Sequence, residues 1–203
     1  MAHARFTVRD YRSEDAEAWL RTWAQVAVTS HAWFFLYQVR PAYARPTVLL
    51  VAEADGHLVG FLDIELENSP GELCYREDEP GGFAWEFGVL PQFRRRGIGR
   101  ALVEEGARRV ARAGRRHVEY WSMDQEAWAF YRAMGMHELE RHYQFFFRPT
   151  PEVKEALAAA GVRVQFLYGT CSPDRWEDIR ARFALIRDRY MDADLCIGFD
   201  HRF

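Results

Sequence analysis

Apolar residues alternate with polar ones, or run together in short blocks, along the first half of the chain. This pattern predicts strands at residues 6–9, 48–52, 57–66 and 83–90. Asp55-Gly56 separates the second and third of these segments and is typical of a two-residue hairpin turn. Between the first two strands, apolar residues at helical spacing, including Trp19 and Trp23, predict a helix with Ser13 as its cap.

The second half of the chain continues with alternating helices and strands. Helical periodicity at 99–113 ends at Gly114, a strand follows at 117–123, and Asp124 is placed to cap a helix that Gly135 ends. A strand is expected at 138–147. After residue 149 the pattern predicts a helix at 152–160, a strand at 162–168, a helix at 173–190 and a strand at 193–199. We therefore expect an α/β fold, with a main domain at 1–149 and a small α/β extension at 150–203.

Composition narrows the class of protein. The chain has 203 residues, of which 49% are hydrophobic, so it can bury a substantial core. A net charge of −3 argues against a general nucleic-acid binder. The three cysteines are far apart and suggest no disulfide framework, which suits a reducing compartment. No apolar run reaches the ~18 residues of a membrane span, and no signal peptide is evident, so we expect a soluble, cytoplasmic protein.

A glycine- and arginine-rich segment joins the predicted strand at 83–90 to the helix at 99–113. N–H groups at a helix start lack internal partners, and the helix dipole favours an anion there. Gly97 and Gly99 let a phosphate approach the backbone closely. A dinucleotide-binding fingerprint would need a third glycine at Leu102, and a P-loop would need a lysine, so neither fits. The turn alone is also compatible with an ordinary strand-to-helix connection.

Two segments resemble the GCN5-related N-acetyltransferase (GNAT) superfamily. Residues 94–100, Arg-Arg-Arg-Gly-Ile-Gly-Arg, are similar to its acetyl-CoA loop, Arg/Gln-x-x-Gly-x-Gly/Ala. Residues 127–136 resemble its A-x-x-F-Y-x-x-x-G-F element, with Met136 in place of Phe. The resemblance covers roughly three-quarters of the chain. It implies a mixed, mostly antiparallel central sheet with splayed fourth and fifth strands, flanked by helices, and an N-acetyltransferase that uses acetyl-CoA as co-substrate.

The resemblance also implies which residues bind the cofactor. The backbone of the loop would hold the pyrophosphate, and the main chain at the end of the fourth strand would hold the pantetheine arm, with the Val89 N–H as oxyanion donor. Asp124 stands where the family usually has Asn; it can cap a helix but lacks the amide donor. The implied cofactor-binding residues are Phe87, Gly88, Val89, Arg94, Arg95, Arg96, Gly97, Ile98, Gly99, Arg100 and Asp124.

Three residues are candidates for proton transfer. Tyr131 matches the position that the superfamily uses as general acid toward the CoA sulfur, although its helix pattern alone favours core packing. Glu119 matches the base of the ribosomal-protein-acetylating branch, and Glu86 is its rival. Both are carboxylates in apolar strands, where burial raises the pKa toward that of a useful base. The alternative for either carboxylate is a position at a solvent-facing edge or an ion pair with an arginine. A chain of water molecules is the alternative base in this family.

Other features bear on the acceptor. The acidic insertion at 72–79 is either a solvated loop or a cover that favours a cationic amine. Aromatic residues at 31–43, in a helix or a loop, fall where this fold usually shapes the acceptor pocket; they are Trp33, Phe34, Phe35, Tyr37 and Tyr43. His137 and His142 are five residues apart and cannot share a helix face, so we expect no metal.

The expected reaction is direct attack of an amine in a ternary complex, because no Cys or Ser is placed to carry the acyl group. The acceptor is a small-molecule amine or a protein N-terminal amine, and no nucleic acid or membrane is expected as a partner. A longer acyl donor and a non-catalytic CoA-binding or dimerisation module are the alternatives. Family analogy suggests a homodimer formed through the C-terminal strands.

Overall fold

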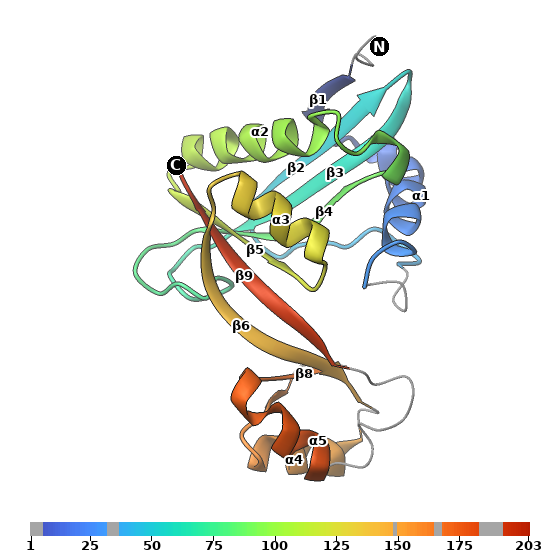
Figure 1. The fold of residues 1–203 in the computed structure, drawn as a ribbon. Helices are drawn as coiled ribbons and strands as arrows, with labels where there is room; N and C mark the ends of the chain where they lie inside the picture. Colours follow the sequence, from blue (N-terminus) through green and yellow to red (C-terminus); the bar gives the residue numbers. More distant parts are fainter. Residues whose placement is uncertain (1–5, 32–36, 148–149, 165–167, 183–192) are drawn as a thin grey trace. The chain divides into compact units, whose positions relative to one another are not determined.

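The computed structural model describes residues 6–31, 37–147, 150–164, 168–182 and 193–203 (Figure 1). Two compact units divide the chain. Unit 1 comprises Met1–Tyr120, Phe130–His137 and Phe199–Phe203, and unit 2 comprises Trp121–Ala129 and Glu138–Gly198. The boundaries between the two units thus fall within three strands and one helix. The predicted functional division at residue 149 stays a prediction.

Unit 1 contains a mostly antiparallel sheet. Its first four strands, β1 (Phe6–Asp10), β2 (Thr47–Ala54), β3 (His57–Leu66) and β4 (Gly82–Val89), are antiparallel neighbours in chain order. β5 (His117–Ser122) pairs in parallel with β4, and β9 (Asp194–Arg202) follows it in the sheet. The turn between β2 and β3 has φ values of 51° at Asp55 and 75° at Gly56, as the predicted hairpin turn requires.

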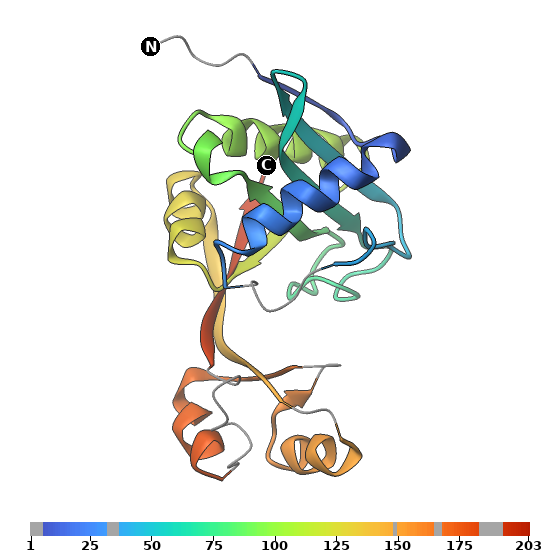
Figure 2. The same ribbon diagram turned by 90° about the vertical axis from the view of Figure 1, so that its right-hand side faces the viewer.

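Two helices cover opposite faces of this sheet (Figure 2). Neighbouring strand residues point to opposite sides. Phe61 of β3 therefore packs with Trp19 and Trp23 of α1 (Ala16–Ala27), whereas Leu62 lies against Gly106 of α2 (Ile98–Arg112). Because both sides are covered, every residue of β3 after its first is buried. This sandwich is the core that holds β4 in place.

The start of the first helix differs from the prediction. A 3-10 turn, η1 (Ser13–Asp15), precedes α1, and the Ser13 hydroxyl contacts Glu14 instead of capping the helix. The Asp15 carboxylate accepts the Arg12 N–H at 2.8 Å and two N–H groups of Arg9 at 2.7 and 2.9 Å. Asp15 thus ties this turn to Arg9 of β1 and bonds back to the residue before the turn, so a 3-10 turn forms where the Ser13 cap was expected.

Unit 2 carries the remaining elements. β6 (His137–Phe146) lies between β9 and β8 (Tyr168–Cys171), and β7 (Arg163–Val164) is at the edge. α4 (Pro151–Ala159), the 3-10 turn η3 (Pro173–Arg175) and α5 (Trp176–Arg182) pack around Phe145, Leu157 and Ile179. α3 (Gln125–Ala133) begins in unit 2 and ends in unit 1. The rest of the helix predicted at 173–190, and the middle of the strand predicted at 162–168, fall outside the described residues.

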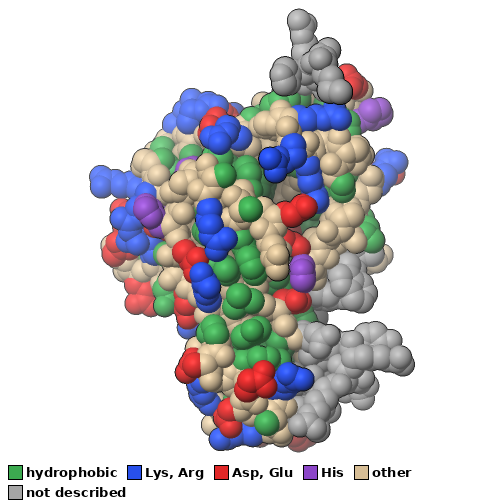
Figure 3. Space-filling view, in the orientation of Figure 1, with side chains coloured by type: hydrophobic (Ala, Val, Ile, Leu, Met, Phe, Trp, Pro, Cys, Tyr) green, Lys and Arg blue, Asp and Glu red, His purple; other side chains and the backbone are tan. Residues whose placement is uncertain are grey.

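Two further sequence expectations concern cysteines and membranes. Cys74, Cys171 and Cys196 are all buried and free, which confirms the absence of a disulfide framework. Within the described segments, none of the helices has the length and apolarity needed to span a bilayer. On the face shown in Figure 3, cationic and anionic side chains are interspersed.

Candidate active site

β4 and β5 separate partway along their length. They pair only from Gly82 to Ala84, opposite Val118 to Tyr120. Further along, Phe87, Gly88 and Val89 pair with β3 and, among the described residues, with no residue of β5. The predicted splay of the fourth and fifth strands is therefore confirmed. The opening exposes main-chain groups that would otherwise complete a ladder, so an extended ligand could bond to them.

The main chain at the end of β4 has a defined direction. The Leu90 N–H donates to the Val59 carbonyl of β3 at 2.9 Å. Because successive N–H groups of a strand point to opposite sides, the Val89 N–H points away from β3, toward the opening. The role of this N–H as oxyanion donor stays a prediction.

A helix N-terminus follows this strand end. A short 3-10 turn, η2 (Pro91–Phe93), leads to Gly97, the N-cap residue of α2, which has a φ of 85°. The first bond of the helical ladder joins the Ala101 N–H to the Gly97 carbonyl at 3.0 Å, so the N–H groups of Ile98, Gly99 and Arg100 precede it. A Cβ built on Gly97 meets nothing within 4 Å. The open, uncapped helix start fits a phosphate group.

The arginines of the loop have different surroundings. Arg94 donates to the Val89 carbonyl at 3.1 Å and to the Thr29 hydroxyl at 3.2 Å, so it braces the loop against the end of β4. Arg95 adopts a left-handed backbone with a φ of 62°. The Arg96 guanidinium lies 5.1 Å from the Phe93 ring, and Arg100 forms an exposed ion pair with Glu104 at 3.5 Å. The loop's shape thus depends on Arg94 in particular.

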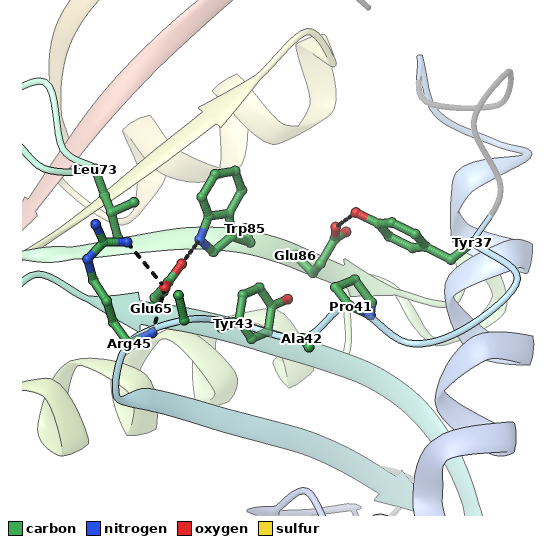
Figure 4. A pocket seen from close by; sticks show the side chains of 10 residues that line it. Tyr37, Pro41, Ala42, Tyr43, Arg45, Glu65, Leu73, Trp85 and Glu86 are labelled. Atoms are coloured by element: carbon green, nitrogen blue, oxygen red, sulfur yellow. Dashed lines mark hydrogen bonds and ion pairs between the residues drawn. The ribbon is translucent and has the colours of Figure 1, made fainter. Parts of the chain in front are cut away.

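A bulge in β4 changes the direction of its side chains. Asp63 of β3 lies opposite Glu86, and the next residue, Ile64, lies opposite Ala84, so Trp85 has no partner across the ladder. In a regular strand Trp85 and Glu86 would point to opposite faces. Here both line the same pocket, as bulges next to active sites often permit (Figure 4).

This pocket has a volume of about 350 Å³ and contains two carboxylates. Glu65 accepts the Trp85 indole N–H at 2.8 Å and the Arg45 backbone N–H at 2.9 Å. Glu86 is the other carboxylate, and Leu73 brings the β3–β4 connection (residues 67–81) to the wall. The acidic insertion is therefore not wholly solvated. The lining residues are Tyr37, Pro41, Ala42, Tyr43, Ala44, Arg45, Glu65, Leu73, Trp85 and Glu86.

Glu86 has two strong hydrogen bonds in a partly buried position. Its carboxylate accepts the Trp23 indole N–H and the Tyr37 hydroxyl, each at 2.6 Å. Burial raises its pKa to about 7, although both hydrogen bonds oppose the shift. Near neutral pH this carboxyl group can therefore exchange a proton with a bound ligand.

Asp63 and Glu65 are two buried carboxylates of β3 that were not singled out from the sequence. Asp63 lies on the same face of β3 as Glu65, and it accepts Arg40 at 2.6 Å and the Tyr43 hydroxyl at 2.9 Å. Burial raises its pKa, and Arg40 opposes the shift. Acidic residues at alternate positions of an otherwise apolar strand were the available signal. Trp33, Phe34 and Phe35 lie outside the described residues.

Tyr131 lies in an aromatic cluster beside the splayed strand. It is 4% exposed, and its ring centroid is 5.3 Å from Tyr120, 6.3 Å from Phe87 and 5.2 Å from Phe199. The structure thus brings Tyr131 to the strand end that carries the opening. Asp124 belongs to unit 2, where its carbonyl accepts the Trp128 N–H at the start of α3.

Glu119 is engaged elsewhere. It is fully buried, and its two oxygens accept the backbone N–H groups of Tyr75 and Arg76 at 2.8 and 2.9 Å. It does not line the described pocket. Of the two carboxylates considered as base, the structure places only Glu86 in the pocket wall.

The known proteins to which this chain is similar are acetyltransferases. The profile described as "Acetyltransferase (GNAT) family" matches residues 7–136. An aminoglycoside N(6')-acetyltransferase type 1 from Stenotrophomonas maltophilia is 35% identical over 106 residues, which is 51% of this chain and 68% of that protein.

Solved structures agree on the fold. The ribosomal-protein-S18-alanine N-acetyltransferase from Escherichia coli has a TM-score of 0.54 at 14% identity, covering 98% of this chain and 94% of that one. The PaiA N-acetyltransferase from Thermoplasma acidophilum, solved in complex with coenzyme A, has a TM-score of 0.54 at 15% identity, covering 67% and 92%.

Proposed function

Since the chain belongs to the GNAT acetyltransferase family and is an acyl-CoA-dependent N-acetyltransferase, we propose that it transfers an acetyl group from acetyl-CoA directly to a primary amine held beside Glu86. The observation that carries the proposal is the opening between β4 and β5, which adjoins the uncapped start of α2. Acetyl-CoA supplies the activated thioester.

The loop provides the residues that hold the co-substrate. The N–H groups of Ile98, Gly99 and Arg100 are in position for a pyrophosphate, and open space above Gly97 leaves room for it. The unpaired edge of β4 at Phe87 and Val89 suits an extended arm bearing amide groups. Asp124, the residue before α3, stays a candidate from the sequence alone. The same loop suits other acyl-CoA donors, so the chain length of the acyl group requires its own test.

Glu86 is the proposed general base. A pKa of about 7 leaves a large fraction ionised at neutral pH, yet makes the group basic enough to accept a proton from an ammonium ion. The Trp23 and Tyr37 hydrogen bonds hold the carboxylate in one orientation. Glu119 is the alternative from the sequence, and its two backbone hydrogen bonds favour a positioning role instead.

Two groups complete the proposed chemistry. The Val89 N–H would stabilise the oxyanion that forms when the amine attacks the carbonyl carbon. The Tyr131 hydroxyl would protonate the departing sulfur, since a phenol with an ordinary pKa near ~10 can donate to a thiolate. No acyl-enzyme is required, because each group acts on substrates bound side by side.

The acceptor we favour is a small amine that carries further positive charge. Glu65 and Glu86 line the pocket, and Asp63 accepts a hydrogen bond from the hydroxyl of Tyr43, which also lines it. Carboxylates at a low-dielectric wall favour cations. The relative from Stenotrophomonas maltophilia is named for aminoglycosides, which have this character. A protein N-terminal amine is the other acceptor class expected from the sequence.

The experiment is to follow thiol release from acetyl-CoA with a panel of aminoglycosides, polyamines and short peptides. We expect the polycationic small molecules to give the highest kcat/KM. Faster turnover of peptides would reassign the acceptor class. If no amine produces thiol while calorimetry shows CoA binding, the chain is a CoA-binding module and not a transferase. Propionyl- and butyryl-CoA in the same assay test the acyl length.

Replacing Tyr131 with Phe tests the proposed acid. We expect kcat to fall about 100-fold with little change in the acceptor KM, because the ring still packs but no longer donates a proton. Tyr168→Phe, a half-buried tyrosine in unit 2, is the matched control. Equal rates for the two variants would show that Tyr131 only fills the core.

A further inference from the structure

Three potential metal ligands form a buried group where the β3–β4 connection meets β5. A sulfur of Cys74, a ring nitrogen of His117 and a carboxylate oxygen of Glu119 all lie within 4.8 Å of one another, the one such group found in the part of the chain that the structure describes. His117 and Glu119 are two residues apart in β5, so they project from the same face. Cys74 comes from the connection that packs on that face.

His117 has no polar partner. It is fully buried, and neither of its ring nitrogens forms a hydrogen bond. A buried imidazole with both nitrogens unpaired is rare, because each unpaired polar atom loses its hydration without compensation. Gly81 packs so closely that a Cβ there would lie 2.2 Å from the His117 Nε2. The ring therefore has little freedom to turn toward another partner, and the unpaired nitrogen points to a missing ligand.

The surroundings are acidic. Besides Glu119, the buried carboxylates of Glu67 and Asp200 lie close enough to the Cys74 sulfur to interact with it electrostatically. Glu67 and Glu119 are themselves fully buried and accept backbone N–H groups, and Asp200 contacts Arg76 at 3.6 Å and Arg202 at 2.8 Å. A divalent cation would offset this local negative charge and stabilise the thiolate.

We propose that Cys74, His117 and Glu119 bind one zinc ion, with a water molecule as fourth ligand, and that the ion fastens the β3–β4 connection to β5. Sulfur, imidazole nitrogen and carboxylate oxygen are the three donor types that zinc takes in proteins. Ligand atoms in a tetrahedral zinc site are about 3.5 Å apart, so the three ligand atoms, which lie within 4.8 Å of one another, would move closer together on binding. Binding replaces the thiol proton, which leaves to solvent as the Zn–S bond forms.

This site is separate from the proposed pocket, since none of its three ligands lines that pocket. Its effect on the reaction would be indirect: Leu73, next to Cys74, forms part of the pocket wall. This group could not be found from sequence spacing, because Cys74 and His117 are far apart along the chain and form no recognised motif.

The test uses the full-length protein without a histidine tag, stripped with a chelator and reloaded with zinc or cobalt(II). We expect one equivalent of zinc per chain by elemental analysis and a higher Tm when zinc is present. Cobalt(II) should give the intense near-ultraviolet band of a cobalt–thiolate bond and the visible bands of a tetrahedral site. Cys74→Ala and His117→Ala should lose these bands, whereas Cys196→Ala, which removes a buried cysteine outside the group, should keep them.

Two results would overturn the proposal. One is a folded wild-type protein that shows no cobalt–thiolate band and no Tm shift with zinc, which requires no variant. The other is a cobalt spectrum of Cys74→Ala identical to that of wild type, which would place the metal elsewhere. If Cys74→Ala does not fold, the cobalt(II) spectra of wild type and His117→Gln are compared instead, and identical spectra would overturn the proposal.

Discussion

Single residues set the acid–base properties of the pocket, and Glu86 illustrates this best. Its pKa of about 7 is the balance between burial, which raises the pKa, and two hydrogen bonds of 2.6 Å, which lower it. The partners, Trp23 and Tyr37, come from segments far away in sequence. A change in either partner should therefore alter the pKa without removing the carboxylate itself.

Tyr37→Phe is the residue-scale prediction. Losing one hydrogen bond to the carboxylate should raise the pKa of Glu86 by about one unit. Because the ionised form is the base, the rising limb of kcat/KM against pH should then move to higher pH by the same amount. Tyr43→Phe is the control, since that hydroxyl binds Asp63 and not Glu86. An unmoved limb in Tyr37→Phe would mean that Glu86 is not the group that titrates.

The residue scale also shows where sequence reasoning is limited. Glu86 could be named from the sequence because a carboxylate in an apolar strand is conspicuous, but its partners could not. Hydrogen bonds between Glu86 and residues of α1 and the following loop depend on tertiary packing. Asp63 was missed, although its alternation with Glu65 on β3 was visible. The Ser13 cap was wrong: residues 13–15 form a 3-10 turn, held by contacts of Asp15 to Arg12 and to Arg9 of β1 that local sequence does not show.

At the scale of elements, three local features form the pocket and the proposed cofactor site. The bulge at Trp85 turns two side chains into the pocket, the end of pairing at Ala84 opens the strand edge, and Gly97 starts α2 without a capping side chain. Helix and strand periodicity predicted the elements around these features. The splay followed from the family resemblance, whereas the bulge had no sequence signal, since its register is set by the pairing with β3.

Gly97→Ala is the element-scale prediction, with Gly56→Ala as its matched control. Both glycines have positive φ and open space around a built Cβ. Alanine in this conformation should cost each variant about 1 kcal/mol of stability. Only Gly97→Ala places a methyl group at the start of α2, so only this variant should bind CoA more weakly, by about tenfold in a calorimetric titration. Equal CoA affinity in both variants would show that the phosphates bind elsewhere.

The whole molecule shows what the sequence could predict and what it could not. The order of helices and strands from residue 6 to 147 was largely predictable, because each element has its own periodicity. The two compact units were not, because their boundary falls within β5, α3, β6 and β9. The acidic insertion at 72–79 was expected to be a solvated loop or a cover, and the sequence did not show what holds it. The buried Glu67 carboxylate holds the β3–β4 connection by accepting the N–H groups of Leu73, Cys74 and Gly81.

The free energy of unfolding of the whole protein should depend on pH through the Glu86 carboxyl group. A raised carboxyl pKa means that the folded state holds its proton more tightly than the unfolded chain does. Stability should therefore fall as pH rises from about 4.5, the ordinary value, to about 7, and then level off. The shift corresponds to an upper limit on the order of 3 kcal/mol. Urea titrations at pH 5 and pH 8 measure the free energy of unfolding at each pH. From pH 5 to pH 8, Glu86→Gln should lose less of this free energy than wild type does. Glu104→Gln, an exposed control, should lose as much as wild type. Equal losses in all three would mean that Glu86 titrates normally.

The most direct test of the proposed reaction is the pH dependence of kcat/KM for acetyl transfer to the best amine of the panel, measured in wild type, Glu86→Gln and Glu119→Gln. We predict that wild type and Glu119→Gln share a rising limb near pH 7. Glu86→Gln should lose at least about 100-fold in kcat/KM at pH 8, and that limb with it. A Glu86→Gln variant with wild-type rates and an unchanged profile would contradict the assignment of Glu86 as base in this pocket.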